Sequence, residues 1–400
     1  MDNKCCFSPA DILLPKKDFE KWSVIACDQY TSEPEYWKSA EKTVGNSASA
    51  LHVILPEAYL DDKTPEKIEK INATMTEYIN SDILNSHKNS VIYIERVQSD
   101  GKIRHGIIGK IDLAQYDYHK GSDAAIRATE ETVLERIPPR VRIRENAPLE
   151  LPHVMLLIDD PEKTVIEPIT AQKSDFEALY NFDLMLNAGH ISGWKLSDAA
   201  AQEVISALCE LESKNDGLLF CVGDGNHSLA SAKACYEKNP NEKNRYALVE
   251  FVNIHDAALE FEPIYRVVFG VNPDTLINAF VDACGGNYCG DDAQKFVCVI
   301  GNEKREISVK PTSKLCVGTL QAFLDNYIKD HSDVTIDYIH GIESVEKLCK
   351  AENTVGFLFD GMRKDELFPA VFNDGSLPRK TFSMGHADDK RFYLEARIIL

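Results

Sequence analysis

The residues best suited to chemistry lie together in one short glycine-rich loop, Gly223-Asp-Gly-Asn-His-Ser228. Gly223 and Gly225 permit positive φ angles and let a ligand approach the backbone closely. The apolar run Leu218–Val222 precedes the loop, and residues 228–238 have a helical pattern after it. A loop between a strand and a helix directs free amide groups and the helix dipole at one point. We therefore predict an anion site here, with phosphate as its natural ligand.

The polar side chains of this loop extend the prediction from binding to catalysis. Asp224 is suited to holding a divalent cation or orienting a hydroxyl group. His227 is suited to contacting phosphate or moving a proton near neutral pH, and Asn226 and Ser228 add hydrogen-bonding groups. The alternative is structural: Asp224 and Ser228 cap a helix, and His227 binds a backbone carbonyl. The spacing fits neither the P-loop nor the dinucleotide fingerprint.

Residues 126–146 form a second feature, because they are rich in arginine within an acidic chain. The arginines are Arg127, Arg136, Arg140, Arg142 and Arg144. A guanidinium group binds phosphate or carboxylate through two parallel hydrogen bonds, so we expect one or two of these residues to line a pocket. The alternative is a solvated helix with local ion pairs.

Two further segments are weaker candidates. Cys27-Asp-Gln-Tyr30 follows a run that resembles a buried strand and is placed to line a site, with Cys27 read as a core thiol rather than a nucleophile. Asp388-Asp-Lys-Arg391 is read as a solvated turn.

The composition narrows the range of partners. Lys and Arg total 44 against 64 Asp and Glu, a net charge of -20. Broad binding to a nucleic-acid backbone requires clustered Lys and Arg, so we expect no nucleic-acid partner, whereas a local basic pocket can still bind a small anion. No apolar run approaches the ~18 residues that span a bilayer, so we expect no membrane partner. Eleven cysteines and a start without an apolar leader segment favour free thiols in the cytoplasm.

The elements that must position these residues mix hairpins with alternating helices and strands. Residues 90–97 and 103–111 flank a strong turn signal at Ser99-Asp-Gly101. Other expected strands cover 22–27, 52–56, 152–158, 218–222 and 246–252, and expected helices cover 64–79, 123–136 and 196–213, with Pro138-Pro139 ending the second helix. This mixture predicts an α+β or mixed α/β fold. A turn-like stretch near residue 270 predicts a phosphate-binding region, 1–270, and a smaller C-terminal α/β lobe, 271–400.

Several segments together resemble the domain-of-unknown-function family numbered 1015, some of whose members carry a ParB/RepB label. They are Gly106-Ile-Ile-Gly-Lys-Ile-Asp-Leu113 with Tyr116, Glu130-x-Thr132 with its trailing arginines, and the 223–228 loop; Leu377–Phe382 is also similar. The resemblance covers essentially the whole chain.

The loop is also similar to the Asp-Gly-His-His-Arg loop of the ParB/sulfiredoxin-like fold. That fold includes DNA-partitioning CTPases, sulfiredoxins and nucleotide-dependent free-serine kinases. Asp224, Gly225 and His227 match the loop, Asn226 replaces its first His, and Ser228 stands where Arg is expected. The resemblance implies a ParB/sulfiredoxin-like core with a nucleotide-phosphate site at this loop, and it requires another arginine to replace the missing one.

We therefore expect a phosphoryl-transfer enzyme that acts on a nucleotide and a small hydroxy or phospho metabolite, with serine or phosphoserine as the specific expectation. The expected catalytic residues are Asp224, His227 and Glu130, with Asp224 also holding Mg²⁺ together with ATP or ADP. The expected phosphate ligands are Gly223, Gly225, Asn226, Ser228, Arg127, Arg136 and Arg140. The alternatives are a phosphatase that uses the same groups, a ParB-like nucleotide-binding regulatory or scaffold protein, and a member without turnover.

Overall fold

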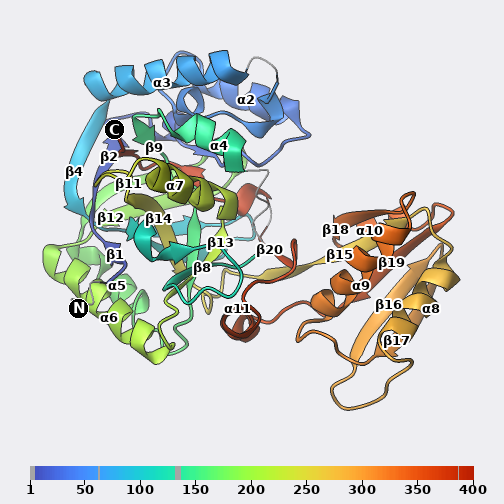
Figure 1. Ribbon diagram of the computed structural model, residues 1–400. Helices are drawn as coiled ribbons and strands as arrows, with labels where there is room; N and C mark the ends of the chain where they lie inside the picture. Colours follow the sequence, from blue (N-terminus) through green and yellow to red (C-terminus); the bar gives the residue numbers. More distant parts are fainter. Residues whose placement is uncertain (1–4, 62–63, 131–136, 386) are drawn as a thin grey trace. The chain divides into compact units, whose positions relative to one another are not determined.

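Figure 1 shows the computed structural model, which describes residues 5–61, 64–130, 137–385 and 387–400. The chain forms two compact units: unit 1 comprises Met1–Leu259 and Gly385–Leu400, and unit 2 comprises Glu260–Met384. This division differs from the expected one, 1–270 and 271–400. The last segment of the chain belongs to unit 1 because two of its short strands pair there: β21 (Phe392–Tyr393) with β3 (Val24–Ile25), and β22 (Arg397–Ile398) with β9 (Leu149–Glu150).

Unit 1 is built on a ten-stranded mixed sheet with the order β11-β12-β5-β6-β14-β10-β13-β8-β7, to which β1 adds by pairing with β6. β10 with β14, β13 with β8 and β7 with β8 are parallel pairs, and β10 with β13 is antiparallel. The fold class is therefore mixed α/β, as predicted. The strands are β1 (Phe7–Ser8), β5 (Ile92–Val97), β6 (Ile103–Asp112), β7 (Tyr116–Asp117), β8 (Ile126–Ala128), β10 (Met155–Ile158), β11 (Glu177–Asp183), β12 (His190–Lys195), β13 (Phe220–Asp224) and β14 (Tyr246–Asn253).

Alternate residues of the central strands enter two separate cores, as the two-residue period of a strand requires. Ile92, Ile94 and Leu248 join one core, and Tyr93 and Val249 join the other. The first core includes residues of α1 (Phe19–Trp22), α2 (Pro34–Val44), α3 (Thr64–Asn80) and the strand pair β2 (Ala10–Pro15) and β4 (Leu84–Ser90). The second includes residues of α5 (Glu167–Ala171), α6 (Asp198–Lys214) and α7 (Asn226–Lys238). Figure 1 shows α2 beside α3, and α5 beside α6.

Unit 2 has a six-stranded antiparallel sheet with the order β17-β16-β19-β15-β18, and β20 pairs with β15. Its strands are β15 (Phe261–Phe269), β16 (Gln294–Ile300), β17 (Glu303–Val309), β18 (Thr335–His340), β19 (Thr354–Phe359) and β20 (Phe382–Met384). Its helices are α8 (Pro273–Ala283), α9 (Cys316–Asp330), α10 (Ile342–Leu348) and α11 (Leu367–Asp374). The stretch near residue 270 is the turn between β15 and α8, inside unit 2.

Several expected elements are confirmed and others are wrong. The helix from Thr64, the hairpin β5–β6 and the helix α6 are present. The expected strand at 52–56 is instead a 3₁₀ helix, η1 (Ala50–Val53), with a second, η2 (Glu57–Tyr59), after it. The helix expected over 123–136 is also wrong, because residues 126–128 form β8 and residues 131–136 lie outside the described part of the chain. Pro138 and Pro139 occupy the first turn of α4 (Ile137–Arg144), where a missing amide proton costs no helical hydrogen bond.

The remaining short helices are η3 (Leu113–Gln115), η5 (Lys173–Asp175), η6 (Met185–Asn187), η7 (Lys364–Glu366) and η8 (Ala387–Asp389). None of the helices in the described ranges combines the length and the apolar character that crossing a bilayer requires.

Candidate functional site

The predicted loop lies at the junction of β13 and α7, inside unit 1. Gly225 immediately precedes α7 and has φ 82° and ψ 25°, a left-handed conformation that favours glycine. A Cβ atom there would lie 3.0 Å from Val154 Cα and 3.2 Å from His153 Cδ2. Gly225 is therefore required both by its backbone angles and by the close approach of the residues that precede β10.

The amino-terminal end of α7 has the amide groups that the prediction requires. The first helical hydrogen bond runs from Leu229 N to Gly225 O, at 3.0 Å. The amides of Asn226, His227 and Ser228 thus make no hydrogen bond within the helix. Within the described chain, no side chain caps this end. The capping role considered for Asp224 and Ser228 is therefore not what the structure has.

Asp224 joins this helix end to a lysine from the last segment of the chain. Asp224 Oδ1 accepts a hydrogen bond from Gly225 N at 2.9 Å. Its Oδ2 lies 3.3 Å from Lys390 Nζ, with 25% and 15% of the two side chains exposed. A half-buried ammonium group therefore stands beside Asp224, two residues before the first residue of α7, and balances its charge.

The end of β8 contacts the same loop. Thr129 Oγ1 donates to Val222 O at 2.7 Å and accepts from Asn226 Nδ2 at 3.4 Å. Asn226 Oδ1 is buried without a hydrogen-bond partner among the described residues, which leaves an acceptor for a ligand's N–H or O–H group. Glu130, the expected base, directly follows Thr129 and is half-buried.

The described arginines of residues 126–146 lie on two different elements, β8 and α4. Arg127, in β8, is buried opposite Cys221 of β13, and its Nε donates to Ala124 O at 2.9 Å. Arg140, in α4, forms an ion pair with Glu57 of η2. α4 contacts α7 and lies beside it in Figure 1. Arg136 lies outside the described residues, and the phosphate-binding roles of Arg127 and Arg140 stay predictions.

A chain of contacts leads from the loop to the segment after β3. His153 adjoins Gly225, and its Nδ1 lies 2.8 Å from Tyr393 Oη. Tyr393 Oη in turn donates to Cys27 Sγ at 3.2 Å. Burial raises the pKa of Cys27 to about 12, so the thiol stays protonated and the core-thiol interpretation is supported.

Asp28, next to this half-buried thiol, has the electrostatic features of a functional carboxylate. Burial alone raises its pKa, but electrostatic interactions with His153 and Lys390 and a hydrogen bond from Gln29 lower the pKa below its ordinary value. Asp28 therefore stays ionised although it is half-buried. Lys390 acts electrostatically on Asp28 and lies beside Asp224, so that two carboxylates interact with one ammonium group.

Buried arginines hold the segment that carries Lys390. Arg96 Nη2 donates to Asp388 O and Arg104 Nη1 to Asp389 O, both at 2.9 Å. The Asp389 carboxylate accepts from Ser99 N at 2.7 Å and from Ser99 Oγ at 2.9 Å. The expectation of a solvated turn at 388–391 is therefore wrong. A charged run can be buried when each charge meets a partner, and that pairing is not visible in the sequence.

Arg391 is a further charged residue of this segment whose charge is balanced by buried partners. It is buried and forms ion pairs with Glu250 and Glu395. Glu250 also lies 3.4 Å from Arg104, so one carboxylate connects β14, β6 and the last segment of the chain. The network fixes the backbone on which Lys390 stands.

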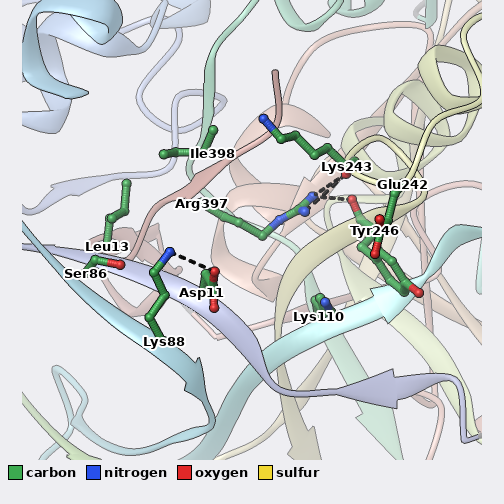
Figure 2. A pocket seen from close by; sticks show the side chains of 10 residues that line it. All are labelled: Asp11, Leu13, Ser86, Lys88, Lys110, Glu242, Lys243, Tyr246, Arg397 and Ile398. Atoms are coloured by element: carbon green, nitrogen blue, oxygen red, sulfur yellow. Dashed lines mark hydrogen bonds and ion pairs between the residues drawn. The ribbon is translucent and has the colours of Figure 1, made fainter. Parts of the chain in front are cut away.

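Figure 2 shows a basic hollow in unit 1, of about 370 Å³, which shares no lining residue with the loop. Three basic side chains of this hollow already have interaction partners. Lys88 pairs with Asp11 at 2.9 Å, Lys110 lies 4.3 Å above the Tyr246 ring, and Arg397 donates to Lys243 O.

No group of three or more His, Cys, Asp and Glu side chains suited to a metal ion occurs within the described residues. The metal-binding role of Asp224 stays a prediction. One carboxylate is compatible with Mg²⁺, which is commonly held by one or two carboxylates together with substrate phosphates.

Comparison with solved structures finds low similarity. A mutant of a free serine kinase in complex with AMP has a TM-score of 0.42 at 11% identity, covering 73% of this chain and 92% of its own. A conserved hypothetical protein from Pyrococcus furiosus has a TM-score of 0.37 at 11% identity, covering 72% and 90%. SbnI from Staphylococcus aureus, truncated at its C-terminus, has a TM-score of 0.37 at 11% identity, covering 70% and 82%.

No curated protein matches the chain. A family model described as "Protein of unknown function (DUF1015)" matches residues 8–327, which is most of the chain and includes the loop at the start of α7. The chain therefore belongs to the DUF1015 family, as its sequence segments indicate.

Proposed function

We propose that this protein is a nucleotide-dependent phosphoryl-transfer enzyme whose phosphate site is the amino-terminal end of α7. The observation that carries the proposal is the meeting of three features: uncapped amides of the first turn, the Lys390 ammonium group, and the carboxylates of Asp224 and Asp28 on which Lys390 acts. Amides and a lysine stabilise the negative charge of a transferring phosphoryl group, and a carboxylate orients the attacking hydroxyl.

Each residue has a distinct role in this proposal. The amides of Asn226, His227 and Ser228 hold phosphate oxygens, and Lys390 neutralises charge that develops during transfer. Asp28 accepts the hydrogen bond of the acceptor hydroxyl, a role that its ionised state permits and that the sequence alone assigns to Glu130. Asp224 would hold Mg²⁺ together with the phosphates of ATP or ADP. Its pairing with Lys390 means that the cation and the lysine share one carboxylate.

The acceptor that we propose is a small hydroxyl compound of the serine class. Water as the acceptor would make the protein a phosphatase with the same phosphate site. The two reactions are distinguished by incubating the chain with labelled ATP, Mg²⁺ and serine, and then measuring phosphoserine against free phosphate.

Thermal shift is the direct test of the phosphate site. ATP, ADP, CTP, pyrophosphate and phosphoserine are added with and without Mg²⁺, because a ligand at 100 times its Kd stabilises the folded chain by about 2.7 kcal/mol. Lys390→Met should remove most of the shift, since the ammonium group faces the bound phosphate.

The matched control is Lys214→Met, which removes a lysine from an exposed ion pair with Glu162 at 3.0 Å, elsewhere in unit 1. It should leave the shift unchanged. If Lys390→Met keeps the full response, or if both variants lose it equally, the assignment of the site is wrong.

A further inference from the structure

Two segments of unit 1 that are far apart in the sequence lie side by side beyond the end of a short strand pair. β3 and β21 pair antiparallel, with Ile25 opposite Phe392. The next residues continue in the same register, since Ala26 N donates to Arg391 O at 3.0 Å. The loop that follows β3 therefore leaves the sheet beside the segment that carries Lys390.

Tyr30 connects this loop to that segment. Its Oη donates a hydrogen bond to the carboxylate of Asp388, two residues before Lys390. Burial and the hydrogen bond to Asp388 raise the pKa of Tyr30, so the hydroxyl keeps the proton that it donates. Asp388 lies in η8, and its carbonyl accepts from Arg96 Nη2 at 2.9 Å. Asp388 is therefore held by its backbone and by its side chain at once.

Tyr30 is itself held in the orientation that this hydrogen bond needs. Its ring stacks on the ring of Tyr36 in α2, with centroids 3.9 Å apart and planes at 10°. Tyr36 in turn meets the fully buried Trp37 edge-on at 5.5 Å. The backbone of Tyr30 has φ 51°, a left-handed conformation that is unfavourable for a residue with a Cβ atom. Such a conformation persists only where surrounding contacts impose it, and it is common at functional sites.

The hydrogen bond from Tyr30 bears on the phosphate site through Lys390. Lys390 Nζ lies 3.3 Å from Asp224 Oδ2, at the loop before α7. A lysine side chain has many rotamers, so its ammonium group keeps one position only if the backbone that carries it is fixed. The loop that Tyr30 anchors also contains Asp28, with which Lys390 interacts electrostatically. The contact between Tyr30 and Asp388 thus holds together the two segments that carry these charges.

We propose that Tyr30 is a positioning residue that keeps the Lys390 ammonium group beside Asp224 through its hydrogen bond to Asp388. Tyr30 touches no reacting group in this role. The inference rests on the proposed function, because it assigns Tyr30 to the phosphate site at the start of α7. Misplacing a group of such a site by about 1 Å can cost roughly 10²-fold in rate, so an anchor outside the site affects the reaction strongly.

The first test measures the position of Lys390 without any nucleotide. The full chain is treated with a limiting amount of acetic anhydride, and the acetylation of each lysine is followed by mass spectrometry. Tyr30→Phe removes only the hydroxyl oxygen and keeps the stacked ring. In this variant Lys390 should be acetylated roughly two- to fivefold faster than in the wild type, the factor that loss of an ion pair is worth. Lys214, whose side chain is 56% exposed, is the internal reference and should react at the same rate in both chains.

The matched control is Tyr36→Phe, which removes the hydroxyl group of the other ring in the same stack. Among the described residues, that buried hydroxyl has no hydrogen-bond partner. Tyr36→Phe should therefore leave the acetylation of Lys390 unchanged. Asp388→Ala should match Tyr30→Phe, whereas Asp388→Asn keeps an acceptor oxygen for Tyr30 and should stay near the wild type. An unchanged rate at Lys390 in Tyr30→Phe, or an equal change in Tyr36→Phe, would overturn the proposal.

A second test separates positioning from general support of the fold. In the wild-type background, Tyr30→Phe should raise the Kd for ADP roughly two- to fivefold. With Lys390→Met already present, Tyr30→Phe should change that Kd no further. A loss of equal size in both backgrounds would show that Tyr30 does not act through Lys390. If the wild-type chain does not bind ADP, the proposed function fails, while the acetylation result still decides whether Tyr30 positions Lys390.

Discussion

The sharpest prediction compares two glycines that share a positive φ angle but differ in the atoms that surround them. Gly225 and Gly217 have φ angles of 82° and 85°, and both belong to unit 1. A Cβ atom at Gly217 meets nothing within 4 Å, whereas at Gly225 it meets Val154 Cα at 3.0 Å and Val154 Cγ2 at 3.1 Å. Backbone atoms cannot move aside as a flexible side chain can, so the contact at Gly225 has to be relieved by shifting the loop.

The expected losses of stability follow from the positive φ angle at both glycines and from the close contact at Gly225. A left-handed alanine costs roughly 1–2 kcal/mol, and both Gly217→Ala and Gly225→Ala incur that cost. Overpacking adds roughly 1–3 kcal/mol at Gly225 only. Gly225→Ala should therefore lower the free energy of unfolding of unit 1 by roughly 2–5 kcal/mol, and Gly217→Ala by roughly 1–2 kcal/mol.

Denaturant unfolding followed by tryptophan fluorescence measures this difference. The chain has three tryptophans, Trp22, Trp37 and Trp194, and all of them belong to unit 1, so the signal follows that unit. Equal losses of stability in the two variants would refute the close approach of His153 and Val154 to the loop, and with it the geometry of the site.

Three further predictions concern separate parts of unit 1. Glu250→Gln should cost roughly 3–5 kcal/mol in the fluorescence assay because it leaves buried Arg104 and Arg391 without their shared carboxylate; a cost below about 1 kcal/mol would contradict this. Asp28→Asn should lower the transfer rate roughly 10²–10⁴-fold while keeping the nucleotide-induced thermal shift, and an unchanged rate would remove Asp28 from the mechanism. The hydrogen bond to Asp256 raises the pKa of His105, so protonation favours the folded chain. This contribution is complete below the unfolded pKa of about 6.5 and is lost as pH rises through the higher folded value, so His105→Asn should cost more stability at pH 5.5 than at pH 9.

The sequence was informative where local pattern decides structure. The hairpin β5–β6, the helices α3 and α6 and the strand–loop–helix at Gly223–Ser228 follow from periodicity, turn residues and glycine, and the structure has all of them. Pro138 and Pro139 misled the prediction because proline ends one helix as readily as it begins the next, and only the following residues show which.

The rest of the site was hidden because it depends on contacts between distant segments. Asp28, His153 and Lys390 are more than 100 residues apart from one another along the chain, and none has a local motif. Lys390 lies in a charged run that its sequence suggests is solvent-exposed. The structure shows otherwise, because the buried Arg96 and Arg104 bind the backbone carbonyls of Asp388 and Asp389 in this run. A sequence pattern reports on neighbours in the chain, whereas these side chains are brought together by sheet order.

The most direct measurement is a crystal structure of the chain with ADP and Mg²⁺. We predict phosphate oxygens within hydrogen-bonding distance of the amides of Asn226, His227 and Ser228, with Lys390 Nζ on the same phosphates. A nucleotide bound in the basic hollow of Figure 2, or phosphates that contact none of these amides, would contradict the account.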